Sequence, residues 1–207
     1  MKSFLITPLL IILLISCGQK NSSKKLNESK KASDTEWISL FNGKDLNNWF
    51  IHGKAKWEVR DGIMTGEGGM GHIYTNTVVK DFVVKGIFRI SEKGNSGLYF
   101  RCNPPKDNPD GWPAGYEAQI DNHQEACTGW MWKPGKPTAK AKELITKDNE
   151  WLTMKVKMIG DKMEIWVNDK LMTEYTDSDY TKGHFAIQGH NPGMTIEIKE
   201  LAYKNLD

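Results

Sequence analysis

The chain has 207 residues, with 28 Lys and Arg against 26 Asp and Glu and only three cysteines. The formal net charge of +2 comes mainly from Lys2 and the lysines between Gly18 and Glu36, so the rest of the chain is close to neutral. A near-neutral domain without a basic block is a poor candidate for nucleic-acid binding, and the cysteines lack the spacing of a zinc site.

The first predicted element is a short apolar segment that runs from Phe4 to Ile15 after the charged Lys2. A membrane-spanning helix needs about 20 apolar residues, so this segment has instead the length of a signal-peptide core. It ends in Leu-Ile-Ser-Cys, which resembles a bacterial lipobox with Cys17 as the acylated residue. A plain secretory signal with an incidental cysteine is the alternative. We expect a signal peptide at 1–16 and a lipid anchor on Cys17, because acyl chains bind membranes through their buried methylenes.

A tether and one domain are expected to follow. Residues 17–36 are rich in Lys, Ser and Asn without apolar periodicity, so they cannot bury enough surface to fold. No acidic run follows Cys17, which favours the periplasmic side of the bacterial cell envelope over export to the cell surface. Residues 37–207 fit a single domain that is long enough to bury a hydrophobic core.

The predicted domain consists of many short strands, because apolar and polar residues alternate along most segments. The clearest examples are 82–90, 152–158, 163–167, 171–175, 185–188 and 195–203. Tight turns separate three consecutive members of this series, which predicts an antiparallel meander over 152–175. No segment keeps a helical period over three turns. The pattern therefore predicts an all-β sandwich or barrel.

Two of the predicted strands, 95–101 and 115–122, carry polar side chains at every second position. Successive side chains of a strand point to opposite faces, so alternate residues share a face. An ordinary solvent face favours Lys, Thr and Ser, whereas this pattern supplies an arginine, two carboxylates, an amide and a phenol. These groups suit a site that binds a polar ligand. They are Tyr99, Arg101, Glu117, Gln119 and Asp121.

Two long loops, 103–113 and 124–143, flank the second polar strand and are rich in turn formers. Long loops in a compact domain often carry binding residues. Cys102 and Cys127 lie beside the polar strands. Both a disulfide between them and two free buried thiols are compatible with the sequence.

Several short motifs, taken in their order and spacing, resemble the 3-keto-disaccharide hydrolase family. They are LFNGKDL at 40–46, WEVRDG at 57–62, NSGLYFR at 95–101, YEAQIDN at 116–122 and GHFAIQGH at 183–190. The resemblance covers essentially the whole globular part of the chain. It implies a concanavalin-like jelly roll of two antiparallel sheets whose concave face binds sugar. It also implies activity on glycosides that are already oxidised to a ketone at C3.

The chain departs from the usual family pattern after the second polar strand. Where members carry Gly-x-x-Tyr and then Trp-Asn, this sequence has Gly129-Trp130-Met131-Trp132 and Trp151-Leu152. The aromatic residue is kept near the first position, and the Asn is lost at the second. Trp130 and Trp132 are the candidates for stacking on a sugar ring, because indoles offer large apolar faces.

The spacing of Glu117 and Asp121 argues against a glycosidase that uses these two carboxylates alone. At about 3.4 Å per residue, their Cα atoms would lie roughly 13 Å apart along one strand. The carboxylate pair of a common glycosidase is separated by about 5–9.5 Å.

A ketone at C3 removes the need for such a pair, because it acidifies the hydrogen on C2. One base can remove that proton, the glycosidic oxygen then leaves by elimination, and water can add afterwards. We assign Arg101 to the developing negative charge and Glu117 or His190 to the proton transfers. The substrate-binding residues are expected to be Tyr99, Gln119, Asp121, Gln188 and Trp130.

A divalent metal ion is an alternative to Arg101 in this scheme. Glu117, Asp121 or His190 could hold such an ion, which would polarise the ketone. No other cofactor is implied.

Each candidate also has a purely structural interpretation. Arg101 and Glu117 could form a cross-strand ion pair, Asp121 could cap a turn, and His190 could order its loop. For the whole protein, the leading hypothesis is an enzyme that cleaves 3-keto-glycosides or 3-keto-disaccharides, as a hydrolase or a lyase. The alternative is a non-catalytic carbohydrate-binding lipoprotein, because jelly rolls serve both roles.

Overall fold

The computed structural model describes residues 36–207 apart from residues 109 and 135. Over this part the chain forms fifteen strands and no helix. The strands are β1 (Ile38–Ser39), β2 (Trp49–Gly53), β3 (Lys56–Arg60), β4 (Ile63–Glu67), β5 (Gly71–Val79), β6 (Phe82–Ile90), β7 (Asn95–Asn103), β8 (Ala114–Asp121), β9 (Met131–Lys133), β10 (Lys136–Ala139), β11 (Leu152–Ile159), β12 (Lys162–Val167), β13 (Lys170–Thr176), β14 (Gly183–Gly189) and β15 (Thr195–Asn205).

The predictions for the N-terminal segment concern residues that the structure does not describe. The signal peptide at 1–16, Cys17 and the tether up to residue 35 lie outside the described residues. Among the residues that are described, no helix is long and apolar enough to cross a membrane.

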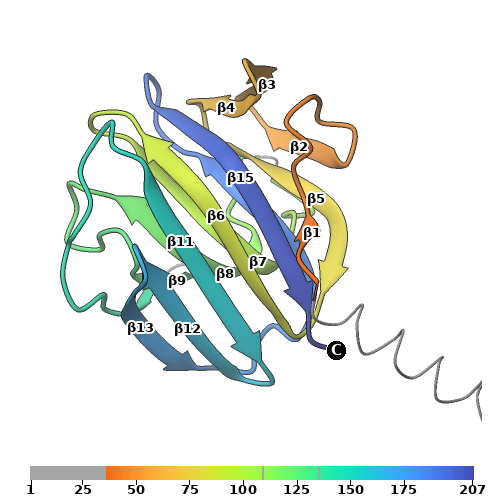
Figure 1. The fold of residues 1–207 in the computed structure, drawn as a ribbon, viewed down its shortest axis with the longest axis vertical. Coiled ribbons are helices and arrows are strands. Elements are labelled where there is room, and N and C mark those ends of the chain that lie inside the picture. The colour runs from red at the N-terminus through yellow and green to blue at the C-terminus, as the bar shows by residue number, and fades with distance from the viewer. Residues whose placement is uncertain (1–35, 109, 135) are drawn as a thin grey trace, which may run out of the picture. The chain divides into compact units, whose positions relative to one another are not determined.

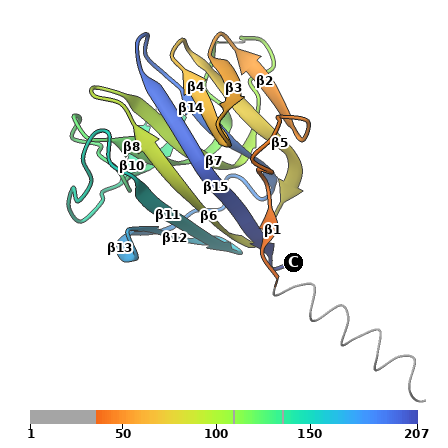
Figure 2. The same ribbon diagram turned by 45° about the horizontal axis from the view of Figure 1, so that its top comes forward.

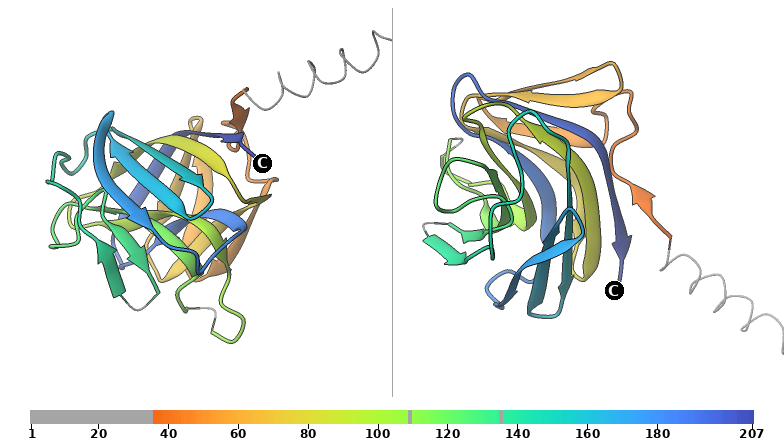
Figure 3. Two further views of the ribbon diagram at one scale, coloured as in Figure 1. Left: turned by 90° about the horizontal axis from the view of Figure 1, so that it is seen from below. Right: turned by 60° about the vertical axis from the view of Figure 1, so that its left-hand side comes forward.

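The strands form two antiparallel sheets that pack face to face (Figure 1). The eight-stranded sheet has the order β13-β12-β11-β6-β15-β4-β3, with β1 paired to β15. The seven-stranded sheet has the order β10-β9-β8-β7-β14-β5-β2. Figures 2 and 3 show β6, β11 and β15 in one layer and β7, β8 and β14 in the other. The predicted all-β sandwich of two antiparallel sheets is confirmed.

Alternate residues of both sheets fill the space between them. Strand β6 contributes Phe82, Val84, Phe88 and Ile90, all of which are fully buried, and the opposite sheet contributes residues such as Leu98 of β7. Burying a side chain of this size contributes about 1.5–3 kcal/mol relative to leaving it in water. The core therefore fixes the register of each strand, because a one-residue slip would turn its apolar side chains outward.

This register decides which residues face outward on the seven-stranded sheet. Leu98 and Phe100 of β7 face the core together with Ala118 and Ile120 of β8. The intervening side chains of both strands must then lie on the face turned away from the core. The predicted meander is also confirmed, since β11, β12 and β13 pair in succession.

Candidate functional site

The outward face of the seven-stranded sheet carries two neighbouring cross-strand rows of polar and aromatic residues. In one row, Glu117 of β8 pairs with Tyr99 of β7 on one side and with Trp132 of β9 on the other. In the next row, Gln119 of β8 pairs with Gly97 of β7. Directly opposed residues on one face lie within reach of each other, so the register alone groups these side chains.

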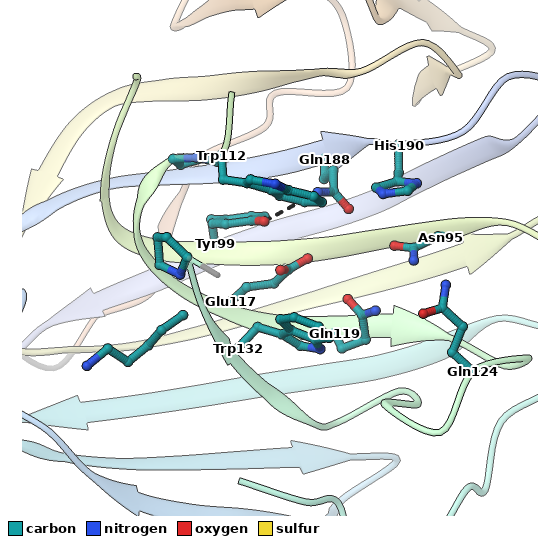
Figure 4. Close-up of a pocket in the computed structure, with 12 residues that line it drawn as sticks. Asn95, Tyr99, Trp112, Glu117, Gln119, Gln124, Trp132, Gln188 and His190 are labelled. Carbon is teal, nitrogen blue, oxygen red and sulfur yellow. Dashed lines mark hydrogen bonds between the residues drawn. The ribbon is translucent and has the colours of Figure 1, made fainter. Parts of the chain in front are cut away.

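A cavity of about 290 Å³ lies over these rows (Figure 4). Ligand pockets occupy about 300–1,000 Å³, so the cavity suits a small ligand. Strands β7, β8, β9 and β14 supply most of its lining, and the loops before and after β8 and the residues that directly follow β9 and β14 supply the rest. The lining residues are Asn95, Tyr99, Trp112, Pro113, Glu117, Gln119, Gln124, Trp132, Lys133, Pro134, Gln188 and His190.

Glu117 lies at the centre of the cavity floor and is only 5% exposed. The absence of a side chain at Gly97 makes room for it, because a Cβ there would lie 2.1 Å from Glu117 Oε1. The Gln119 amide, turned so that its nitrogen faces acceptors, donates to Glu117 Oε1 and to the Ser96 carbonyl, both at 3.1 Å. Burial raises the pKa of Glu117 to about 8, against the opposing effect of the Tyr99 hydroxyl. At neutral pH the carboxyl group is therefore mostly protonated.

Tyr99 and Gln188 form the next part of the floor. Gln188 Nε2 donates to the Tyr99 hydroxyl at 3.3 Å, and Gln188 Oε1 is buried without a hydrogen-bond partner (Figure 4). Burial raises the pKa of Tyr99, and the neighbouring Glu117 raises it further. Tyr99 thus remains a hydroxyl donor over the physiological pH range.

Two tryptophans form the walls of the cavity on either side of Glu117 (Figure 4). The position of Trp132 beside Glu117 is explained by the pairing of these two residues across β8 and β9. Trp112 comes from the loop before β8, is 46% exposed, and packs against His190 with ring centroids 5.5 Å apart. The predicted stacking residue Trp130 is 6% exposed and does not line the cavity, whereas Trp132 does.

His190 lines the end of the cavity near Asn95 (Figure 4). Its Nδ1 has no hydrogen-bond partner. Burial lowers the pKa of His190, and Asp121 acts in the opposite direction. The imidazole is therefore neutral at pH 7 and able to accept a proton.

The structure contradicts the prediction that Arg101 shares a face with Tyr99. The pairing of β7 with β8 shifts between Phe100 and Asn103, and Arg101 adopts a φ of 46° within this bulge. A bulge redirects the side chain that it contains. Arg101 is 2% exposed and donates to the carbonyls of Lys80 (2.6 Å), Gly160 (2.8 Å) and Tyr180 (3.1 Å) and to Asp81 Oδ1 (2.8 Å).

Arg101 therefore neither lines the cavity nor pairs with Glu117. Each of its three side-chain nitrogens donates to the turns at one end of the sandwich. The predicted role of Arg101 in stabilising negative charge on a substrate has no support in this geometry.

Asp121 is also placed differently from the prediction. It is 2% exposed, and its Oδ1 accepts hydrogen bonds from the backbone N–H groups of His123 (2.7 Å) and Gln124 (3.1 Å). This is the turn cap that the structural interpretation described. Asp121 does not line the cavity, so it is not placed to bind a ligand there.

The metal hypothesis is not supported by the arrangement of the candidate ligands. In residues 36–207, leaving out 109 and 135, no group of three or more His, Cys, Asp or Glu side chains is arranged to hold a metal ion. Glu117, Asp121 and His190 therefore do not form a shared site. Cys102 and Cys127 are both buried free thiols, so no disulfide closes the loop between them.

Lys133 is the cation in the lining of the cavity, but its charge is already compensated. Its ammonium binds Asp177 Oδ2 at 2.7 Å and also contacts Asp179. Burial lowers the pKa of Lys133, yet these two carboxylates raise it more, so the group stays charged and bound to them. Among the described lining residues, no uncompensated positive charge faces the ligand space.

Sequence reasoning missed several residues of this site. Gly97 lies inside the NSGLYFR motif at 95–101, but only the three-dimensional contact shows that its missing side chain makes room for Glu117. Trp112 lies in the loop at 103–113 between the two polar strands, and the length of that loop was the one sequence feature that indicated binding residues there. Asn95 precedes the alternating part of its strand and Gln124 lies in the following loop, so no periodic pattern marked them.

The fold and the cavity define a two-sheet β-sandwich protein with a polar, aromatic-walled pocket on the outer face of one sheet. The 3-keto-alpha-glucoside-1,2-lyase-like domain family matches residues 36–207, and the chain belongs to this family. The resemblance found in the sequence motifs is thereby confirmed. Membership places the chain among glycoside-acting domains. No curated protein matches the sequence.

Solved structures show the same fold at low sequence identity. A candidate glycosyl hydrolase from Parabacteroides distasonis is 21% identical, with a TM-score of 0.70 over 87% of this chain and 97% of the other. The carbohydrate-binding module CBM66 from Bacillus subtilis is 18% identical, with a TM-score of 0.61 over 81% and 100%. A Bacillus subtilis protein of unknown function with a galectin-like fold is 13% identical, with a TM-score of 0.65 over 83% and 95%. These likenesses confirm the predicted jelly-roll architecture.

Proposed function

We propose that the protein cleaves 3-keto-glycosides, including 3-keto-disaccharides, by removing the proton on C2 and expelling the aglycone. The observation that carries the proposal is the pairing of two proton-exchanging groups in one cavity. Glu117 and His190 both line it, and burial reverses the usual order of their pKa values, because it raises the pKa of Glu117 to about 8 and lowers that of His190. Acid and base catalysts work best when their pKa values are near the working pH.

Family membership supports the choice of a ketone-bearing substrate. The family description names a 3-keto-alpha-glucoside, and a ketone at C3 makes the C2 hydrogen removable by one positioned base. The aromatic walls of Trp112 and Trp132 are suited to the apolar faces of a sugar ring. Gln119, Gln188 and Asn95 supply hydrogen bonds for its hydroxyl groups.

A non-catalytic carbohydrate-binding role is the second candidate. The observation that favours it is the similarity in fold to a carbohydrate-binding module, together with the aromatic walls of the cavity. A binding module needs stacking and hydrogen bonds but no buried proton donor. The buried carboxyl group of Glu117 therefore favours catalysis over binding alone.

The two candidates are separated by incubating the full-length protein with a 3-keto-glucoside and with the same glucoside unoxidised. Release of the aglycone from the keto compound alone supports the proposed function. Binding of both sugars without turnover, measured by calorimetry, supports the carbohydrate-binding alternative. A parallel incubation with a chelator tests whether a metal ion contributes to turnover.

A further inference from the structure

Three neutral hydrogen-bond donors line the cavity side by side. They are the hydroxyl of Tyr99, the carboxyl of Glu117 and the indole N–H of Trp132, which occupy one cross-strand row over β7, β8 and β9. The Trp132 Nε1 is buried without a partner. Buried polar groups are normally hydrogen-bonded, so an unpartnered donor beside a cavity points to a ligand acceptor.

The surroundings of Glu117 favour its neutral form. The carboxyl group is 5% exposed, and Gly97 admits it into a slot of the sheet. The groups that face it are Tyr99 from β7, Gln119 from β8 and Trp132 from β9, none of which is a cation. The nearby Lys133 is bound to Asp177 and Asp179. A carboxylate would have no compensating charge here, whereas a carboxylic acid can donate a hydrogen bond.

The end of the cavity near Asn95 offers a proton acceptor instead (Figure 4). His190 projects from the end of β14 and packs against Trp112, and its Nδ1 has no partner in the described residues. Asp121 is the carboxylate that raises the pKa of His190 against the effect of burial, and the Oδ1 of Asp121 accepts hydrogen bonds from two backbone N–H groups. His190 therefore lines the ligand space as a neutral imidazole, and its buried Nδ1 has no hydrogen-bond partner within the part of the chain that the structure describes.

We propose that protonated Glu117 and Tyr99 donate hydrogen bonds to the ketone oxygen at C3 as it becomes an enolate, and that His190 removes the proton from C2. This inference rests on the proposed function and assigns the roles within it. The sequence left the proton transfers to either Glu117 or His190, and this inference assigns the base to His190 and makes Glu117 a hydrogen-bond donor. A carboxylic acid that is kept neutral in an apolar site is an effective donor to an enolate oxygen, especially beside a phenol.

The proposed steps balance as follows. The C2–H bond breaks, its proton passes to His190, and its electron pair forms the C2=C3 bond while the C3 carbonyl becomes an enolate oxygen. The enolate then re-forms the C3 carbonyl, a double bond forms between C1 and C2, and the bond from C1 to the aglycone oxygen breaks. The proton on His190 passes to the departing oxygen. Addition of one water molecule across the C1=C2 bond converts this elimination into net hydrolysis.

The role of Glu117 is tested by comparing Glu117→Gln and Glu117→Ala in the full-length protein with a 3-keto-glucoside. An amide still donates a hydrogen bond but cannot act as a base. Loss of one such donor reduces rates by about 10²–10³-fold, so we expect that loss for Glu117→Ala and at least ten-fold higher activity for Glu117→Gln. Wild-type kcat/KM should fall as the pH rises past about 8, and this fall should be absent in Glu117→Gln.

The opposite outcomes overturn the assignment. If Glu117 is the base, Glu117→Gln will be as inactive as Glu117→Ala, and wild-type activity will rise with pH up to about 8 or above. Glu164→Gln is the matched control, because it removes a carboxylate from β12 in the other sheet and should leave the pH profile unchanged. Unfolding in urea confirms that both Glu117 variants are folded.

The role of His190 is tested with a 3-keto sugar that carries no leaving group at C1, such as 1,5-anhydro-3-keto-glucitol. In D₂O, proton NMR should show exchange of the C2 hydrogen with wild type and slower exchange with Glu117→Gln. His190→Ala should show none above the uncatalysed rate. Persistent exchange in His190→Ala overturns the assignment. If wild type neither exchanges this hydrogen nor cleaves the 3-keto-glucoside, the proposed function itself fails and the role assignment fails with it.

Discussion

At the scale of single residues, the site depends on a glycine as much as on the groups that carry chemistry. Gly97 lies in the same strand as Tyr99, and its missing side chain leaves the space that Glu117 Oε1 occupies. Glycine is used here for close approach and not for an unusual backbone angle. The Glu117 carboxyl group and the space that it occupies are therefore encoded by different strands.

Replacement of Gly97 by Ala tests this arrangement. The added Cβ would meet Glu117 Oε1 at 2.1 Å, so the carboxyl group must move out of its slot. We expect cleavage of a 3-keto-glucoside to fall at least ten-fold, with a loss of about 1–3 kcal/mol in the free energy of unfolding from overpacking. Activity and urea denaturation are measured on the same preparation.

Gly86→Ala is the matched control for this substitution. Its Cβ would meet Phe88 at 2.6 Å in the other sheet, so it should cause a similar loss of stability without affecting the cavity. Equal losses of activity in the two variants, after correction for the folded fraction, would contradict a specific effect on Glu117.

His72 illustrates a second consequence of burial. It pairs with Gln188 across β5 and β14, is fully buried, and has no partner for either ring nitrogen. Burial lowers the pKa of His72 to about 3, with smaller contributions from His52 and His190. The unfolded chain therefore binds one more proton than the folded protein between about pH 6.5 and pH 3.

His72→Phe should reduce the sensitivity of the fold to acid. In wild type, this one group lowers the free energy of unfolding by about 1.4 kcal/mol per pH unit as the pH falls below about 6.5. Above that pH the group contributes no such dependence, and removal of two unpartnered nitrogens should be neutral or stabilising. Urea denaturation from pH 7.5 to 4 should show a stability difference in favour of the variant that grows as the pH falls. A difference that stays constant with pH would contradict this account of His72.

At the scale of the structural elements, one bulge decides which side chains enter the site. Alternation correctly placed Tyr99 and Glu117 on the outward face, because the apolar residues between them must face the core. It failed two residues later, where the bulge in β7 turns Arg101 away. Period-two patterns carry no information about a bulge, which depends on contacts with other strands.

The same reasoning explains the other successes and failures of prediction. Strand β6 was predicted with its observed ends, because its apolar and charged residues alternate without interruption. The pocket residues from loops, Trp112 and Gln124, follow no periodic pattern and become neighbours only through the folded path of the chain. Asp121 was assigned to ligand binding by its face, yet its hydrogen bonds are to the turn that follows β8.

Arg101→Met should destabilise the fold while leaving the chemistry of the folded enzyme intact. The guanidinium binds three backbone carbonyls and Asp81, and it joins the β5–β6 and β11–β12 turns to β7. Breaking a buried pair of this kind costs about 3–5 kcal/mol. We expect a lower urea midpoint, with kcat at 15 °C per folded molecule within a few-fold of wild type.

Arg60→Met provides the comparison, because Arg60 forms an exposed pair with Glu58 and should cost at most about 1 kcal/mol. A loss of kcat of a hundred-fold or more in folded Arg101→Met would contradict this prediction and show that Arg101 contributes to catalysis.

At the scale of the whole molecule, the sandwich presents its site on the outer face of one sheet and keeps its core between the two. Residues of β7, β8, β9 and β14 and of the loops beside them line the cavity, while the eight-stranded sheet contributes none of the described lining residues. Changes in the eight-stranded sheet should therefore affect stability more than substrate choice. The N-terminal part of the sequence adds a separate proposal, which concerns where this domain acts.

Cys17→Ser should release the protein from the membrane fraction of bacterial cells. The Leu-Ile-Ser-Cys sequence resembles a lipobox, and replacement of its cysteine removes the acylated group. Cell fractionation and labelling with a fatty-acid analogue measure both effects, with the activity on a 3-keto-glucoside unchanged. Equal membrane retention of the two proteins would contradict the proposed anchor.

The central claim of this account is that a ketone at C3 is required for cleavage. Its most direct test is the rate of aglycone release from a matched pair of glucosides that differ only in oxidation at C3. We predict release from the 3-keto compound, with loss of the C2 hydrogen to solvent, and no detectable release from the unoxidised compound. Equal cleavage of both compounds, or tight binding of both without cleavage, would contradict the account.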